Sequence, residues 1–449
     1  MLSSRLPKDL SPSPFFAELE RTKAEVLAVC ANADGRVGNV AELPFIDMTV
    51  SSPVKAGLPI DLDAAVDEGR ESFGCWNPDA AGWKSAREAV VEYYRERGGN
   101  FTAGQIILTA STSEAYSVLF KTFCDPGDVI LTPMPGYPLL DTLAQLEHLE
   151  CAPYFLSLRR ENARKIATDE RRTKNVILSG AKNPVTSTFR FVLDSDSLLA
   201  APERSKILLL VSPHNPTGHC VSREEWNAAV RFCEDNNMIL VVDEVFGDYA
   251  FSPEVRRSWE YVLDDRRKTI DESNIWDAGG GDFVNLPEDG PKCPIFWLNG
   301  LSKAVGSPQL KLGWMAFYAP RERFEEIRAA LEFVEDAYLS VSAPAQALGI
   351  SLLPKAAAYE SRVRERLLTN WQTLREAFPS KYCPEVLGGW YAVVRLGEDD
   401  EKITLRLLRE KHVLVQPGFF FDFDEDGWVV ISLLQEPAQF KEAISRIKQ

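Results

Sequence analysis

Three polar side chains of this sequence each end an apolar run that is typical of a buried β-strand. Asn215 follows residues 207–211, Asp243 follows residues 239–242, and Lys303 ends a third such segment. An amine at a strand end can form a Schiff base with an aldehyde, and a carboxylate can keep a pyridine nitrogen protonated. A side-chain amide can donate to a phenolic oxygen. The three residue types, in this order, predict a site for pyridoxal 5′-phosphate (PLP).

Each of these residues also has a simpler explanation. A buried carboxylate such as Asp243 needs a cationic partner, which an ordinary Lys or Arg could supply. Asn215 precedes Pro216 and could only open a turn, and a lone lysine is often an exposed loop residue. In the predicted site, Lys303 lies beside a cationic ring, so we expect its pKa to be lowered. Its free amine would then move the substrate α-proton.

A helix start near residue 112 offers a place for the phosphate of the cofactor. Ser111 and Glu114 have the spacing of a capping box, and a helix N-terminus presents free N–H groups to an anion. The capping pattern alone would explain this segment. Beside the predicted ring site, however, it favours phosphate binding by Thr112 and Ser113.

Other residues near these strand ends complete the predicted cofactor site. Tyr137 could stack on a flat ring or pack in the core. Ser302 precedes the Schiff-base lysine and is predicted to contact the phosphate. Lys311 would place a second cation on the phosphate, with a surface strand lysine as the alternative.

The surrounding pattern predicts the elements that position these residues. Residues 82–97 have the pattern of a helix that stops at Gly98. Short apolar runs at 106–109 and 129–132 then alternate with amphipathic stretches such as 113–124. This alternation predicts an α/β fold with a mostly parallel sheet.

The chain divides into a larger and a smaller predicted domain. Residues 45–319 form the large one, and residues 320–449 form a smaller α+β domain joined by residues 1–44. The basic stretch 157–191 and the Asp-, Glu-, Gly- and Pro-rich stretch 252–292 are predicted to be surface insertions. An anionic partner for the basic stretch is the less favoured alternative.

Composition narrows the class of protein. The chain has 449 residues, 45% of them hydrophobic, which suits two globular domains. A net charge of −16 disfavours a nucleic-acid surface. Eight scattered cysteines and four histidines favour neither a disulfide framework nor a metal site, and indicate a reducing cytoplasm. We expect no signal peptide and no membrane span.

The order of phosphate turn, aromatic residue, Asn215, Asp243, Lys303 and distal cation resembles the class I/II aminotransferases, which are fold-type I PLP enzymes. The resemblance covers roughly residues 40–440. It implies a large domain with a mostly parallel seven-stranded sheet and a small domain built from both chain ends. It also implies a homodimer with active sites at the interface, and ping-pong transfer of an amino group between an amino acid and a 2-oxo acid.

The sequence departs from the family pattern at four positions. Lys311 stands in place of a phosphate-binding arginine, and Phe246 in place of a tyrosine that binds the phenolic oxygen. Trp76 replaces a tyrosine that reaches the other subunit's phosphate. Val430 occupies the place of the arginine that usually binds the substrate α-carboxylate, so substrates without that group become possible.

Two alternatives share these residues. A PLP-dependent carbon–sulfur β-lyase would use the same cofactor site and differ only in its products. A catalytically retired PLP fold that serves as a binding protein is consistent with Val430, but the retention of Asn215, Asp243 and Lys303 opposes it.

Overall fold

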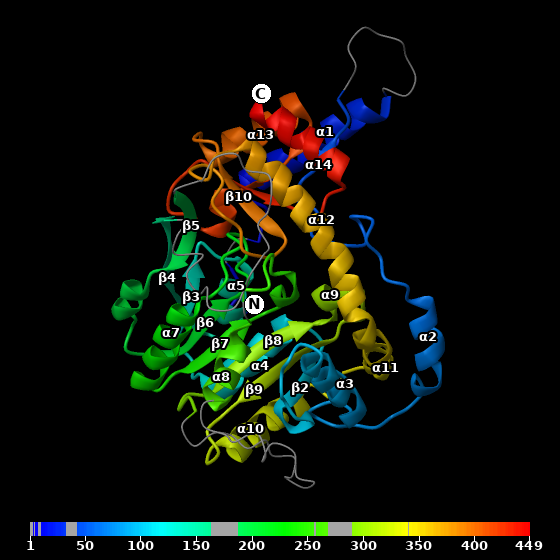
Figure 1. The fold of residues 1–449 in the computed structure, drawn as a ribbon, viewed down its shortest axis with the longest axis vertical. Helices are drawn as coiled ribbons and strands as arrows, with labels where there is room; N and C mark the ends of the chain where they lie inside the picture. Colours follow the sequence, from blue (N-terminus) through cyan, green and yellow to red (C-terminus); the bar gives the residue numbers. More distant parts are fainter. Residues whose placement is uncertain are drawn as a thin grey trace.

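The computed structural model describes residues 3, 5–7, 10–32, 43–162, 187–255, 257–267, 290–339 and 341–449. Its centre is an eight-stranded sheet with the order β2-β9-β8-β7-β6-β3-β4-β5 (Figure 1). The strands are β2 (Ile106–Thr109), β3 (Val129–Met134), β4 (Glu150–Asn162), β5 (Ser187–Leu193), β6 (Ser205–Val211), β7 (Ile239–Asp243), β8 (Ile295–Gly300) and β9 (Gly313–Tyr318).

Most of the central strands point in one direction. Strands β8, β7, β6, β3 and β4 pair in parallel. Strand β9 is antiparallel to both β8 and β2, so β2 points the same way as the parallel set. The predicted α/β fold class is confirmed. The sheet has one strand more than the seven that the resemblance implies, because β5 pairs antiparallel with β4.

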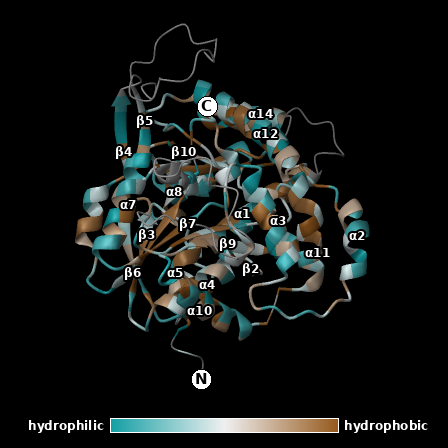
Figure 2. Cartoon of the chain, turned by 60° about the horizontal axis from the view of Figure 1, so that its bottom comes forward, coloured by the Kyte–Doolittle hydropathy of each residue, from teal (hydrophilic) through white to brown (hydrophobic). Residues whose placement is uncertain are grey.

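Both faces of the sheet are buried, as expected for parallel strands covered by helices. Along β7, Ile239 and Val241 join one apolar cluster, whereas Leu240 and Val242 join the other. Figure 2 shows hydrophobic residues concentrated on β6 and β7. Helices α4 (Thr112–Phe123), α5 (Leu139–Leu146) and α10 (Phe324–Asp336) cover one face; α3 (Lys84–Arg95), α7 (Arg223–Asp235) and α8 (Ser258–Arg267) cover the other.

Parts of the two predicted insertions belong to helices and strands. Strand β4 continues through Asn162, and β5 begins at Ser187, so both ends of the stretch 157–191 belong to the sheet. Part of the stretch 252–292 forms α8, whose Trp259 is buried in the core. The sequence pattern did not predict these elements because polar residues interrupt their short apolar periodicities. Residues 163–186 and 268–289 lie outside the described residues.

The C-terminal part builds a smaller sheet. Strands β10 (Tyr391–Arg395) and β12 (Gln416–Pro417) flank β13 (Trp428–Ser432), and β1 (Ile46–Asp47) pairs with β11 (Val413–Leu414). The helices here are α12 (Ala356–Ala377), α13 (Asp400–Lys411) and α14 (Pro437–Lys448), with α11 (Ala343–Leu352) before them.

The two ends of the chain lie together. On α1 (Pro14–Asn32), Phe15 and Leu19 pack with Leu408 of α13 in one apolar cluster. Contact between the N-terminal helix and C-terminal elements is consistent with the predicted joining of residues 1–44 to the smaller domain, whose boundaries stay a prediction. Within the described residues, no helix combines the length and the apolar character needed to cross a membrane.

Candidate active site

One pocket lies where the carboxyl ends of the parallel strands meet. Its volume is about 340 Å³, which is within the usual range for small-molecule sites. All the residues that the sequence predicted for the cofactor line it: Thr112, Ser113, Tyr137, Asn215, Asp243, Ser302, Lys303 and Lys311. The topology explains this convergence, because β2, β3, β6, β7 and β8 end at the same sheet edge and the antiparallel β9 begins there.

Lys303 lies in α9 (Leu301–Ala304), a single turn directly after β8. Its Nζ is 4.7 Å from the ring centre of Trp390 and 5.4 Å from that of Phe246. Burial lowers the pKa of Lys303 to about 8, although the charge of Asp243 acts to raise it. The amine is therefore a better nucleophile near neutral pH than an exposed lysine.

Asp243 ends β7 and is held by two donors. Its Oδ2 accepts a hydrogen bond from the Tyr116 hydroxyl at 2.6 Å, and its Oδ1 accepts one from the Val245 N–H at 3.0 Å. Burial raises the pKa of Asp243, while these hydrogen bonds and the charge of Lys303 oppose the rise. A buried carboxylate of this kind gains from a cationic partner in the pocket.

The N-terminus of α4 opens onto the same pocket. Ser111 Oγ accepts a hydrogen bond from the Glu114 N–H at 3.2 Å. The Glu114 carboxylate accepts from the Ala110 N–H, not from that of Ser111, so only one half of the predicted capping box forms. Thr112 and Ser113 occupy the first turn, where backbone N–H groups have no partner within the helix.

β9 approaches this turn closely. A Cβ atom on Gly313 would come within 3.0 Å of the Ser111 carbonyl carbon and 3.1 Å of the Thr112 nitrogen. Lys311, two residues earlier, is exposed in a left-handed backbone conformation with φ of 53°. It forms no ion pair with any described residue, so its charge is available to an anion in the pocket.

The residues around the pocket fit PLP. Asn215 lines the wall, and its Oδ1 is buried without a hydrogen-bond partner among the described residues. An unpaired buried amide is costly, and a ligand oxygen can satisfy it because the two ends of an amide exchange by a flip. The chain thus offers an amine for the aldehyde, a carboxylate for the ring nitrogen, and a helix N-terminus with a lysine for the phosphate.

Tyr137 lies at the mouth of the pocket. Its side chain is 47% exposed, and its ring centre is 6.5 Å from that of Phe421. Core packing, the alternative explanation for Tyr137, does not fit a side chain this exposed. An exposed ring at a pocket edge is free to contact a bound ligand.

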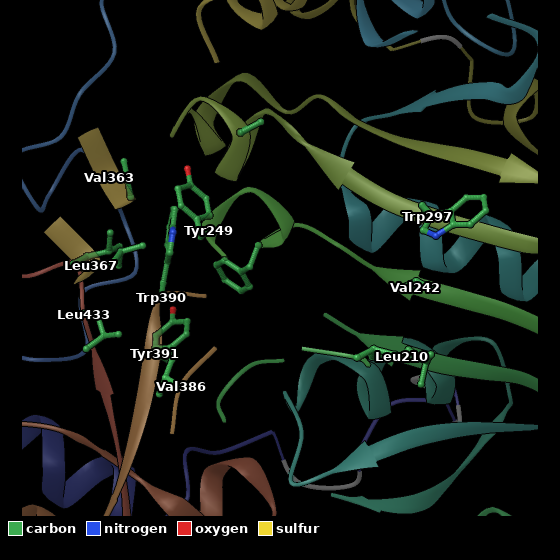
Figure 3. Packing of buried hydrophobic residues seen from close by; sticks show 14 of the residues in the cluster. Leu210, Val242, Tyr249, Trp297, Val363, Leu367, Val386, Trp390, Tyr391 and Leu433 are labelled. Carbon is green, nitrogen blue, oxygen red and sulfur yellow. The ribbon is translucent and has the colours of Figure 1, made fainter. Parts of the chain in front are cut away.

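Several residues of the site were not predicted from the sequence. Tyr116, which binds Asp243, lies one helical turn after Thr112, and this i, i+4 spacing is the signal that could have found it. Tyr249 donates to the Lys303 carbonyl oxygen at 2.6 Å. Trp390 lies between Tyr249 and Tyr391, and its ring centre is 5.2 Å from that of Tyr249 (Figure 3). No local pattern marks these last contacts, which join distant segments.

Val430, at the position of the family arginine, is fully buried in β13. It pairs with Val393 of β10, one pleat away from the pair formed by Tyr391 and Ser432. Because side chains alternate along a strand, Val430 shares a face with Ser432, next to the pocket-lining Tyr391. This face therefore presents an apolar side chain at that position.

A second, larger hollow of about 530 Å³ lies beside β4 and β5. Its wall includes Phe191, Arg395, Glu425 and Trp428, and none of the residues predicted for the cofactor. Arg395 forms an ion pair with Glu425 within it. Since the amine, carboxylate and amide all face the smaller pocket, that pocket is the candidate active site.

Comparison with known proteins identifies the family. The family model described as aminotransferase class I and II matches residues 76–447. Tyrosine aminotransferase of Caenorhabditis elegans is 21% identical over 91% of this chain and 78% of its own. Alanine aminotransferase of Mycobacterium tuberculosis is 24% identical over 82% of this chain and 76% of its own.

Solved structures share the fold. An aminotransferase from Escherichia coli superposes with a TM-score of 0.72 at 19% identity, covering 100% of this chain and 97% of the other. Alanine aminotransferase from Pyrococcus furiosus gives 0.71 at 19% identity, covering 98% of each chain. These findings favour an aminotransferase over the lyase and the retired fold. The chain belongs to the class I and II aminotransferases, PLP-dependent enzymes that transfer an amino group between an amino acid and a 2-oxo acid.

Proposed function

We propose that Lys303 is the residue that binds the cofactor covalently and moves the substrate proton in this aminotransferase. The observation that carries the proposal is the convergence of Lys303, Asp243 and Asn215 on one pocket from three adjacent strand ends. PLP supplies an electrophilic aldehyde and a ring that accepts electrons. The chain must then hold that ring, deliver a base and exclude water.

Each residue has a separate task in this proposal. Asp243, oriented by Tyr116, would keep a proton on the ring nitrogen of bound PLP, and the Asn215 amide would donate to its phenolic oxygen. The first turn of α4, with Thr112 and Ser113, holds the phosphate together with Ser302 and Lys311. Tyr137 limits the tilt of the ring.

Lys303 moves the proton. As a free amine in this pocket, Nζ has a pKa of about 8, so part of it is unprotonated and able to act as a base near neutral pH. Nζ would accept the proton of the donor's amine-bearing carbon and later release it, because the hydrogen bond from Tyr249 fixes the Lys303 backbone while the side chain moves. Ping-pong kinetics would follow, because the donor's nitrogen would stay in the pocket with the cofactor after the first product has left.

A mass measurement tests the assignment. Borohydride treatment of the holoenzyme should attach the cofactor irreversibly to the peptide that contains Lys303. In Lys303→Ala, the covalent label and turnover should both be lost, while non-covalent PLP binding persists. A label on another lysine, or substantial transamination by the alanine variant, would contradict the assignment. Lys292→Ala, at an exposed position outside the pocket, is the matched control.

The proposal extends to assembly and location. Large apolar side chains are exposed at Trp76 (76%), Phe333 (79%), Tyr338 (54%) and Leu339 (64%). Exposed apolar groups of this size favour association, and a second copy of the chain is the proposed occupant. Light scattering should give twice the chain mass of 50.2 kDa. A cytoplasmic location agrees with the scattered thiols and is tested by cell fractionation.

A further inference from the structure

The charged groups of the active-site pocket are few. The described wall carries two cations, Lys303 and Lys311, and one anion, Asp243. In the proposed function, on which this inference rests, all three are used by the cofactor: Lys303 by the aldehyde, Lys311 by the phosphate, and Asp243 by the ring nitrogen. The remaining described side chains of the wall meet the donor as neutral groups.

Those neutral groups form an apolar chamber with hydroxyls at one side. Leu140 and Phe246 are buried, and the pocket wall also includes Leu139 at the start of α5. Tyr137 and Tyr391 add two aromatic rings. The Tyr391 hydroxyl is hydrogen-bonded to Ser51, and burial raises its pKa above the usual range, so it stays a neutral donor or acceptor.

The second layer behind Tyr391 is also apolar. Ser432, which is opposite Tyr391 on β13, donates its hydroxyl to the Val50 carbonyl oxygen at 2.5 Å. The next pair is Val393 and Val430, and both side chains are buried. A carboxylate pressed against this side would lose hydration without gaining a cation from the described chain.

From this arrangement we infer that the amino donor carries a large apolar or aromatic substituent, and that a carboxylate on its amine-bearing carbon is not required. The donor class is therefore an amino acid with a large apolar or aromatic side chain whose carboxylate the described wall does not bind as a charge, so that its amide and the corresponding primary arylalkyl amine also serve as donors. Its nitrogen is exchanged for the aldehyde oxygen of the cofactor, and its carbon is oxidised to a carbonyl as the cofactor is reduced to the amino form. Burial of apolar surface, at about 25 cal/mol per Å², supplies the affinity.

Matched donors test the charge requirement. The holoenzyme is mixed with L-phenylalanine, L-phenylalaninamide, phenethylamine or L-alanine, and conversion of the cofactor to its amino form is followed by absorbance. We expect kcat/KM for the amide and the amine to equal or exceed that for phenylalanine, and phenylalanine to exceed alanine. A cationic residue that binds the donor's carboxylate would instead favour phenylalanine over its amide by about 10- to 100-fold, and that result would overturn the inference.

Binding without turnover gives an independent reading. The probes are 3-phenylpropionate and 3-phenylpropanamide, whose dissociation constants are measured by calorimetry in low and high salt. Neutral recognition predicts similar or tighter binding of the amide and little effect of salt. Tighter, salt-sensitive binding of the carboxylate would overturn the inference and indicate a cation from outside the described pocket, such as one from a partner subunit.

A variant pair locates the chamber. Leu139 lines the pocket, whereas Leu146, at the other end of α5, does not. Leu139→Ala should reduce the preference for phenylalanine over alanine by about tenfold, and Leu146→Ala should leave it unchanged. Equal effects from the two variants would overturn the placement.

The outcomes separate this inference from the proposed function. If Lys303 carries no borohydride-trapped cofactor, the proposed function fails, whatever the ligands do. If the label is on Lys303 and phenylalanine is strongly preferred over its amide, only the inference fails. If no donor reacts, the binding of 3-phenylpropionate and 3-phenylpropanamide still decides whether the pocket requires a carboxylate on its ligand.

Discussion

The hydroxyl of Tyr116 donates a hydrogen bond to Asp243 Oδ2 across 2.6 Å, from one helical turn inside α4. The same helix presents its N-terminus to the phosphate site. Helix α4 therefore acts at the phosphate end through its N-terminus and at the ring-nitrogen end through Asp243. The hydrogen bond favours the ionised form of a carboxyl whose pKa burial raises.

Removing this donor should shift the pH dependence of catalysis. In Tyr116→Phe, the pKa of Asp243 rises further, so the acid limb of the kcat profile moves to higher pH and activity at low pH falls by about tenfold. Tyr154→Phe is the control, because Tyr154 donates to the Leu209 carbonyl oxygen, not to Asp243, and does not line the pocket. An unchanged acid limb in Tyr116→Phe would show that the hydroxyl does not tune Asp243.

Capture of the cofactor should follow the ionisation of Lys303. Its free amine forms as pH rises through a pKa of about 8, not through the usual 10.5. The rate of covalent PLP incorporation into apoprotein should therefore rise with a midpoint near pH 8. Asp243→Asn removes a charge that raises this pKa, so its midpoint should lie lower. A midpoint that rises in that variant would contradict the assigned direction.

Gly313 should be required for cofactor affinity. Gly313→Ala places a Cβ 3.0 Å from the Ser111 carbonyl carbon, which displaces the first turn of α4 from the phosphate. The dissociation constant for PLP should rise by about tenfold or more, with circular dichroism unchanged. Gly74→Ala is the control, because a Cβ there meets no atom within 4 Å and its φ is not positive. Equal affinity in the two variants would remove this turn from the phosphate site.

Lys311 should act on the phosphate alone. Lys311→Ala should weaken PLP binding by about tenfold and leave the binding of pyridoxal, which lacks the phosphate, unchanged. Lys311→Arg should retain PLP affinity because the charge remains. The comparison is made by equilibrium dialysis with Lys303→Ala as the common background. Equal losses for both ligands would indicate a structural role for Lys311.

A buried ion cluster behind the site should dominate stability. Arg97 bonds to Asp248 at 2.8 Å and to Glu360 at 2.7 Å. Although burial acts to raise it, Arg257 and Arg97 hold the pKa of Asp248 well below its usual range. Arg97→Ala leaves the buried Glu360 without its ion-pair partner and Asp248 with Arg257 alone, and should lower the free energy of unfolding by about 3 kcal/mol.

Urea denaturation measures that loss, with a neighbouring residue as the control. Arg95 forms an exposed i, i+3 pair with Glu92, so Arg95→Ala should change stability by less than about 0.5 kcal/mol. Asp248 stabilises the fold above its unfolded pKa and loses this effect in acid. In Arg97→Ala its pKa rises, so acid unfolding should begin at higher pH. Equal losses in the two variants would contradict a special role for the buried cluster.

Residues at strand ends could be predicted from the sequence, whereas their supporting contacts could not. Asn215, Asp243 and Lys303 follow apolar runs whose parallel pairing forces their ends onto one edge. Tyr249 and Trp390 reach the site through tertiary packing, for which a single sequence carries no local signal. The strand β5 was not predicted because Arg190, between Phe189 and Phe191, belongs to a locally basic stretch that was interpreted as a solvated loop.

The connection from β8 to β9 carries Lys303 near its start and Lys311 near its end. Because the two strands are antiparallel, both lysines return to the same sheet edge. A molecule that bonds covalently to Lys303 and forms an ion pair with Lys311 therefore links the two ends of this connection. Loading the cofactor should protect residues 301–312 from amide hydrogen exchange more than any other turn, which makes the enzyme's own loop a reporter of occupancy.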